Sequence, residues 1–175
     1  MKFSLSTNIK NTQYDDFHYI ATPNSRQVLG SLVADYNTGI HCFTLIGTYG
    51  TGKSSFLVAL ENDLTLNTKV LFDNKGQFNH YQKFQFLNIV GDYNSLSNLL
   101  SDELNKDNIN SKELFSRLDL KLKHHKEEKE FLFLVIDEFG KILEHAANHN
   151  PEKELYFLQQ LAEFRWCHRL IATLS

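Results

Sequence analysis

The stretch that decides the fold is Gly47-Thr48-Tyr49-Gly50-Thr51-Gly52-Lys53-Ser54, which directly follows the apolar run Cys42–Ile46. It matches G-x-x-x-x-G-K-[ST] at every fixed position, the pattern of a phosphate-binding loop. We expect its three glycines to adopt positive φ, so that the backbone N–H groups curl around an anion. Lys53 is then expected to reach the β- and γ-phosphates, and the Ser54 hydroxyl to ligate Mg²⁺.

The flanking sequence supplies the structural context that this motif needs. The apolar run before it predicts a buried strand, and residues 54–61 predict a helix with Phe56, Leu57 and Leu60 on its buried face. The N-terminal dipole of that helix would also face the phosphates. A glycine-rich turn can match the pattern by chance, but a strand before it and a helix after it favour a nucleotide site.

A second candidate half-site follows the apolar run Phe131–Ile136, which ends in Asp137-Glu138. A carboxylate at the carboxyl end of a neighbouring buried strand faces the phosphate loop across the edge of a parallel sheet. We therefore assign Asp137 to Mg²⁺, directly or through water, and Glu138 to activation of the attacking water as a general base. The structural alternative makes both acids the N-cap and first turn of the following helix.

The rest of the chain alternates between predicted strands and helices. Thr22-Pro23 is an N-cap followed by proline at the first helical position, and the helix it opens ends near Gly39. Strands are predicted at residues 40–46, 69–72, 84–90, 131–136 and 169–175, the first of them buried on both faces as in a parallel sheet. Further helices are predicted at residues 54–66, 95–104, 111–122, 138–148 and 151–164. This order predicts an α/β protein with a parallel sheet, and we divide it into an N-terminal segment (1–22) and one domain (23–175).

Composition limits the classes of function. The 175 residues carry a net charge of −3, which indicates no general attraction to nucleic acid, although local basic patches remain compatible with it. No apolar run approaches the ~20 residues that span a bilayer, and the N-terminus lacks the apolar core of a signal peptide. Two cysteines that are far apart in sequence fit reduced thiols. We expect a globular cytoplasmic protein with no membrane partner.

The two motifs together resemble P-loop ATPases of the class with an additional catalytic glutamate, which includes AAA+ proteins. Gly47–Ser55 looks like the G-x-Y-G-[ST]-G-K-S-S loop of large bacterial ATP-binding proteins, and so do the segments Ile136–Ala147 and Leu158–Glu163. Those proteins are suspected of roles in phage defence or DNA processing. The resemblance implies a three-layer P-loop NTPase sandwich that binds ATP and Mg²⁺, with residues 19–22 near the adenine. The nucleotide-binding residues it implies are Gly47, Thr48, Tyr49, Gly50, Thr51, Gly52, Lys53, Ser54 and Ser55.

The sequence departs from the AAA+ pattern after its last predicted strand. That pattern continues with a fifth strand and often a helical lid, whereas this sequence ends at Ser175, so the domain is expected to be truncated after the fourth core strand and to have no lid. Thr173 or Ser175 is the candidate polar sensor. Arg165 and Arg169 are candidates for an arginine finger, with surface ion pairing as the alternative.

The leading hypothesis is a Mg-ATP-dependent ATPase domain that drives a conformational change in a partner or in a region missing from this sequence, with weak or partner-dependent turnover. The expected partner is another protein or a second copy of the chain. A nucleotide-sensing switch that binds ATP and hardly hydrolyses it is the alternative. Asp137-Glu138-Phe139-Gly140 also fits the D-x-x-G motif of regulatory GTPases, but the N-K-x-D motif for guanine is missing downstream, which favours ATP over GTP. A small-molecule kinase would need an acceptor pocket and an arginine-bearing lid, and neither is visible.

Overall fold

The computed structural model describes residues 7–10, 17–71, 78, 81, 83–104, 110–127, 130–163 and 169–174, of which 122, 125–127 and 169–174 are described by their backbone alone. The elements within these residues run in the order α1 (Pro23–Asn37), β1 (Cys42–Ile46), α2 (Lys53–Thr65), β2 (Lys83–Val90), α3 (Leu96–Glu103), α4 (Ser111–Glu127), β3 (Glu130–Asp137), α5 (Phe139–Asn148), α6 (Pro151–Ala162) and β4 (Arg169–Leu174). The predicted alternation of strands and helices is confirmed.

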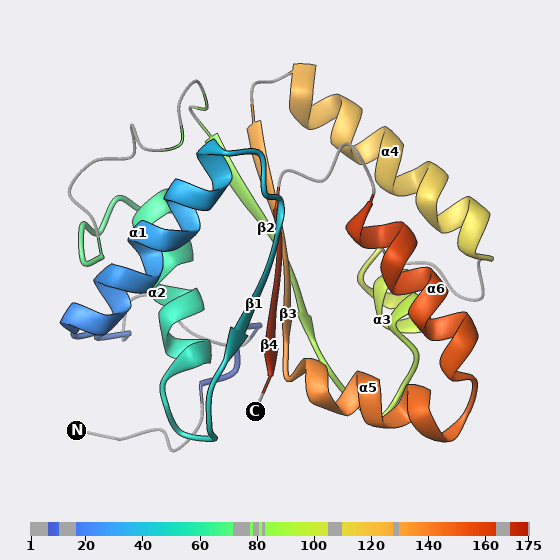
Figure 1. Cartoon of the computed structure of the whole chain (residues 1–175). Coiled ribbons are helices and arrows are strands. Elements are labelled where there is room, and N and C mark those ends of the chain that lie inside the picture. The colour runs from blue at the N-terminus through green and yellow to red at the C-terminus, as the bar shows by residue number, and fades with distance from the viewer. Residues whose placement is uncertain are drawn as a thin grey trace.

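The four strands form one parallel sheet in the order β1-β4-β3-β2. Its register aligns Thr44 of β1 with Ala172 of β4, and Ala172 with Ile136 of β3. The carboxyl ends of all four strands therefore lie at one edge of the sheet, the lower edge in Figure 1. The loop after β1 and the turn after β3 leave from this same edge.

Helices cover both faces of the sheet, which gives three layers. α1 and α2 lie on one face, and α3, α4, α5 and α6 lie on the other (Figure 1). The predicted α/β three-layer sandwich is confirmed. No helix among the described residues is long and apolar enough to cross a membrane.

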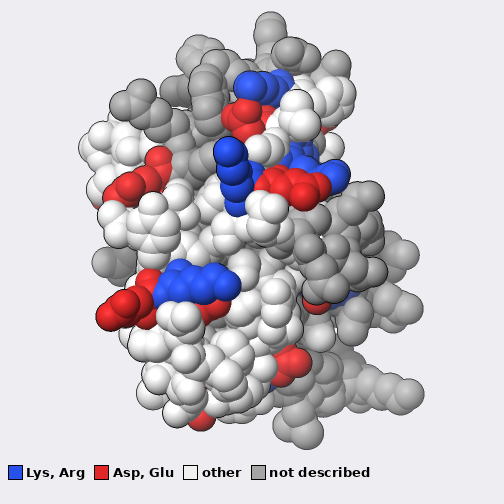
Figure 2. All heavy atoms as spheres, turned by 90° about the vertical axis from the view of Figure 1, so that its right-hand side faces the viewer, with Lys and Arg blue, Asp and Glu red and all other residues white. Residues whose placement is uncertain are grey.

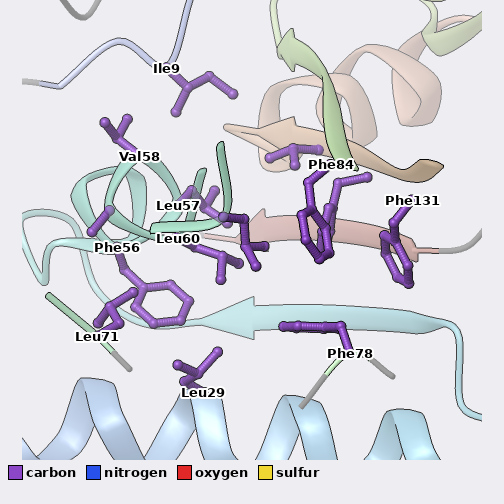
Figure 3. Close-up of a cluster of buried hydrophobic side chains, with 14 of the residues drawn as sticks. Ile9, Leu29, Phe56, Leu57, Val58, Leu60, Leu71, Phe78, Phe84 and Phe131 are labelled. Carbon is purple, nitrogen blue, oxygen red and sulfur yellow. The ribbon is translucent and has the colours of Figure 1, made fainter. Parts of the chain in front are cut away.

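The core is built around β3, whose eight residues are all buried. Alternate side chains of a strand point to opposite faces of a sheet. Phe131 and Phe133 accordingly pack with α1 and α2 in one hydrophobic cluster, whereas Leu132 and Leu134 pack with α3–α6 in the other. Figure 3 shows the first cluster, which contains Leu57 and Leu60 of α2 together with Phe78, Phe84 and Phe131. The sequence prediction of a strongly buried strand at residues 131–136 is confirmed.

Helix α2 is buried over far more of its surface than one apolar stripe. Every residue from Phe56 to Leu64 is buried, including three polar ones. Part of the cover comes from residues 7–10, where Ile9 is buried and lies near Val58 in Figure 3. The sequence correctly predicted that Phe56, Leu57 and Leu60 are buried, but the buried surface of α2 is wider than predicted. Contacts with the N-terminal segment are not encoded in the spacing of apolar residues along the helix.

The predicted strand at residues 69–72 is wrong for its described part, residues 69–71, which are irregular. The N–H groups of Val70 and Leu71 donate to the buried carboxylate of Asp63 at 2.8 and 2.6 Å. Asn67 and Lys69 adopt left-handed backbone conformations, with φ of 62° and 60°. The donors that a strand would use are thus taken by a side chain of α2.

The prediction that the first strand is buried on both faces is also wrong. Along β1, half-buried residues alternate with exposed ones, and Ile46 is 80% exposed. The strand lies at one end of the four-stranded sheet, with β4 on one side. Position in the sheet, rather than apolar content, decides how much of a strand is buried.

Candidate functional site

In the loop between β1 and α2, two of the three glycines adopt the positive φ that was predicted for all three. Gly50 and Gly52 adopt φ of 80° and 82°, where a side chain would strain the chain. Gly47 does not adopt positive φ, contrary to expectation. A Cβ on Gly47 would lie 3.0 Å from Thr51 Oγ1, so this glycine permits a close approach within the loop.

The loop is closed by hydrogen bonds from its own side chains. Lys53 Nζ donates to the carbonyl oxygens of Gly47 and Thr48 at 2.7 and 3.0 Å, and Thr51 Oγ1 donates to the Thr48 oxygen at 2.9 Å. Helix α2 begins at Lys53, after Gly52 as its N-cap, and no side chain caps it. The lysine and the helix N-terminus therefore meet at the loop, which is the geometry that attracts an anion.

A cavity of 630 Å³ lies beside this loop. That volume is in the range of small-ligand sites, about 300–1,000 Å³. The loop contributes Gly47 and Gly50–Lys53 to its lining, and the chain before α1 contributes Tyr19, Ile20 and Thr22. The stretch predicted to lie near the adenine thus shares one cavity with the predicted phosphate loop.

Other predicted loop residues lie outside the cavity lining. Tyr49 is 77% exposed, and Thr48 contributes its carbonyl oxygen to the loop bonds. Ser55 Oγ is hydrogen-bonded to Thr7 Oγ1 at 2.9 Å, which directs that side chain toward the N-terminal segment. Ser54 stands half-buried in the first turn of α2.

The second predicted half-site lies at the same edge of the sheet. Asp137 ends β3, is 4% exposed, and its Oδ1 accepts the N–H of Glu138 at 3.0 Å. One strand, β4, separates β3 from β1, so the ends of these two strands lie about 10 Å apart. This spacing brings a buried carboxylate into the neighbourhood of the loop and of the start of α2.

Glu138 occupies an unusual turn between β3 and α5. Its φ of 54° is left-handed, a conformation rare for residues with side chains. It stands at the N-cap of α5, but its side chain caps nothing. The carboxylate instead pairs with Lys141 Nζ at 2.5 Å. The alternative in which Glu138 serves as a helix cap therefore has no hydrogen bond to support it.

The sequence analysis did not identify three residues of this edge as part of a site, namely Gly91, Asp92 and Lys141. Gly91 follows β2, and its N–H donates to the Asp137 carbonyl oxygen at 2.7 Å. The hydrogen bond to Glu138 raises the pKa of Lys141, burial lowers it, and the charges of Glu138, Asp92 and Tyr49 raise it further, so that the net direction is upward. Asp92 could have been found from its position after a parallel strand, and Lys141 from its spacing of three from Glu138 on a helix.

The remaining candidates are placed by their backbone or not at all. Thr173 lies near the carboxyl end of β4, opposite Leu45 of β1, so it reaches the edge that carries the loop. Arg169 begins β4, at the amino end of that strand. Arg165 and Ser175 lie outside the described residues.

No family model and no curated protein matches the chain. Three solved structures of AAA+ ATPases have similar folds. PCH-2 of C. elegans has a TM-score of 0.54 and 19% identity, over 89% of this chain and 39% of that one. The DNA-bound Drosophila ORC structure has a TM-score of 0.52 and 13% identity, over 99% and 46% of the two chains. The ORC2 protein of Aeropyrum pernix, solved as ADPNP and ADP complexes, has a TM-score of 0.52 and 13% identity, over 93% and 44%.

The fold is that of a P-loop ATPase domain. At these identities the likeness establishes the fold, and the site rests on the geometry above. The chain spans less than half the length of each of the three proteins.

Proposed function

We propose that the chain is a Mg-ATP-binding ATPase domain of the class with an additional catalytic glutamate. One observation carries the proposal: the 630 Å³ cavity is lined both by phosphate-loop residues and by Tyr19, Ile20 and Thr22. A phosphate cradle and an aromatic-aliphatic wall in one cavity suit the two ends of a nucleotide. The left-handed backbone at Gly50 and Gly52 supports the phosphate end.

Each residue has a defined task in this proposal. Lys53, whose ammonium bonds two loop carbonyls, turns to the phosphates when a nucleotide provides stronger, charged acceptors. Tyr19 and Ile20 contact the base. Glu138 accepts a proton from the attacking water as general base.

Magnesium fits the oxygen atoms that the site offers. Ser54 supplies a hydroxyl and Asp137 a buried carboxylate, and hard oxygen donors are the ligands that Mg²⁺ prefers. No group of three or more His, Cys, Asp or Glu side chains suited to a metal occurs among the described residues. Two protein ligands are compatible with Mg²⁺, which keeps several waters and takes the remaining oxygens from the phosphates. The bound ion would neutralise charge that develops on the phosphates during transfer.

We further propose that the ATP cycle changes the conformation of a protein partner or of a second copy of this chain. This chain covers 39%, 46% and 44% of the three similar structures, so more than half of each lies outside the part that resembles this chain. On the described part of the face formed by α3–α6, positive and negative side chains lie next to each other (Figure 2). That mixture favours a protein partner over nucleic acid for this face. A role in phage defence or DNA processing remains a prediction from the sequence resemblance.

A nucleotide-sensing switch that hardly hydrolyses ATP is the second candidate. The observation that favours it is the ion pair of Glu138 with Lys141, because that contact occupies one of the two carboxylate oxygens that a general base offers to water. The two candidates predict the same binding and different turnover.

The test is ATP turnover in the presence of Mg²⁺ for the parent chain and for Glu138→Gln, with ATP binding measured in parallel. General base catalysis typically contributes about 10²–10⁴-fold, so the variant should lose turnover by that order and keep binding. Glu144→Gln, a change on the same helix, is the matched control and should match the parent. Binding without turnover in the parent would select the switch, and no binding in the parent would refute both candidates.

A further inference from the structure

Lys141 is tied to Glu138 at two points. Its backbone N–H donates to the Glu138 carbonyl oxygen at 3.1 Å, and its Nζ lies 2.5 Å from Glu138 Oε2. The side chains of Lys141 and Glu138 are 52% and 38% exposed, so the pair is partly open to solvent. One residue of α5 therefore contacts both the backbone and the carboxylate of the candidate general base.

The backbone under this pair is fixed from the other side. Glu138 adopts a left-handed conformation at φ of 54°, and the preceding peptide accepts the Gly91 N–H at 2.7 Å. A Cβ on Gly91 would lie 2.3 Å from the Glu138 carbonyl oxygen, so no side chain fits there. With its backbone clamped in this way, the direction of the Glu138 carboxylate depends on its χ angles, and the contact with Lys141 selects among them.

Lys141 lies in the first turn of α5, which follows β3 at the sheet edge that also carries the phosphate loop. Apart from Glu138, the groups close enough to raise its pKa are Asp92, which follows β2, and Tyr49 in the loop. Two carboxylates at this edge would repel a polyphosphate, and a cation bound to one of them offsets part of that repulsion.

We propose that Lys141 is the positioning residue of the candidate site: it aims the Glu138 carboxylate and offsets the negative charge that Glu138 presents to the terminal phosphate of a bound nucleotide. The proposal rests on the function proposed above and adds a residue to it. Lys141 acts through Glu138 and makes no contact with the reacting atoms. Its removal should weaken binding of ATP more than of ADP, because the terminal phosphate lies nearest to the unbalanced carboxylate.

The competing explanation is an ordinary ion pair on a helix surface, and the chain provides a matched example. Lys123 pairs with Asp119 on α4 at 2.6 Å and is about as exposed as Lys141, at 57%. Helix α4 lies toward the end of the sheet opposite the loop (Figure 1). Removal of Lys123 should therefore cost a surface ion pair and nothing at the site.

The experiment compares Lys141→Met, Lys141→Arg and Lys123→Met in the full chain. ATP and ADP affinities are measured by calorimetry with Mg²⁺, and turnover is measured on the same samples. We expect Lys141→Met to weaken ATP binding roughly two- to fivefold, the size of a partly exposed charge interaction, and ADP binding less. Its turnover number should fall about tenfold or more, because a misdirected base loses its attack geometry. Lys141→Arg should retain most of both, since it keeps the cation, and Lys123→Met should match the parent.

Measuring ATP and ADP affinities for the same Lys141 variants in a chain that also carries Glu138→Gln distinguishes two roles of Lys141. It acts either through Glu138 or directly on the phosphates. With a neutral side chain at position 138, Lys141→Met should no longer discriminate ATP from ADP. If Lys141→Met still weakened ATP binding more than ADP binding in the Glu138→Gln chain, Lys141 would act directly on the nucleotide, and the proposal would be overturned. Equal ATP affinity, ADP affinity and turnover in Lys141→Met and Lys123→Met would overturn it as well. If the parent binds ATP without turnover, the affinities alone decide; if the parent binds no nucleotide, the proposed function fails first and the inference with it.

Discussion

Gly91 gives the sharpest structural prediction about the turn that carries the candidate general base. A Cβ at this position would lie 2.3 Å from the Glu138 carbonyl oxygen, 2.9 Å from the Glu138 carbonyl carbon and 3.0 Å from the Asp137 oxygen. These are backbone atoms, so no side chain can rotate away. Non-bonded carbon and oxygen atoms need about 3.3 Å or more, and Gly91→Ala must therefore move the two backbones apart by about 1 Å.

Two measurable effects follow from that displacement. Overpacking of a rigid contact typically costs about 1–3 kcal/mol, which corresponds to a melting temperature lower by roughly 2–12 °C for a domain of this size. Misplacement of a catalytic group by about 1 Å can cost about 10²-fold in rate. The 630 Å³ cavity lies beside the loop after β1 and is not lined by Gly91, so ATP affinity should change much less than turnover.

The assay combines thermal unfolding, ATP affinity and turnover for Gly91→Ala and for Gly30→Ala. Gly30 lies in α1, and a Cβ added there would meet nothing within 4 Å, so alanine should stabilise the helix by about 0.5–1 kcal/mol and leave turnover unchanged. Gly91→Ala with parental stability and parental turnover would refute the reasoning, because it would mean that the backbone of the Asp137-Glu138 turn is not confined by the chain after β2.

Two further predictions concern other carboxylates. Asp137→Asn should remove most Mg²⁺-dependent turnover while the fold is retained, which is checked by titrating Mg²⁺ in the turnover assay and recording circular dichroism; unchanged metal dependence would contradict the assignment of Asp137. Asp63→Leu should destabilise the chain by about 1–3 kcal/mol for each backbone donor left unpaired, since the N–H groups of Val70 and Leu71 lose their acceptor. Urea unfolding measures that loss, and a change below ~0.5 kcal/mol, ordinary for a surface substitution, would show that these donors find other partners.

The parts of the fold that could be predicted from the sequence are those fixed by short-range chemistry. Thr22 was expected to cap the helix that starts at Pro23, and its Oγ1 accepts the Ser25 N–H at 3.1 Å. The loop after β1 follows from its glycines, because glycine adopts without strain the positive φ found at Gly50 and Gly52. The run at residues 131–136 is apolar without alternation, which is typical of a strand covered on both faces, and every residue of β3 is buried.

The errors arise where distant contacts override a local pattern. Residues 69–71 have strand-like composition, but Asp63 takes their N–H donors and Lys69 adopts φ of 60°. The apolar content of β1 suggested burial, yet burial depends on strand order, which the pattern of one segment does not encode. A helical stripe underestimated the burial of α2 for the same reason.

In the candidate site, too, the residues within short motifs could be predicted from the sequence, whereas those brought together from distant segments could not. Its two motifs lie in short contiguous stretches, so Lys53, Asp137 and Glu138 were accessible to sequence reasoning, and their roles remain predictions. The residues that shape the turn around Glu138 come from separate elements. Gly91 follows β2 and matters because of a 2.7 Å bond to β3, which only the strand order brings about.

The central claim is that the cavity beside the loop holds ATP by its phosphates, and direct binding tests it. ATP binding with Mg²⁺ should be measured for the parent, for Lys53→Ala and for Lys112→Ala, which changes an exposed lysine in the first turn of α4. At a free ATP concentration 100 times Kd, binding should stabilise the parent by about 2.7 kcal/mol and raise its melting temperature by roughly 5–11 °C. The account predicts this shift in the parent and in Lys112→Ala and its loss in Lys53→Ala. An equal shift in all three would contradict it.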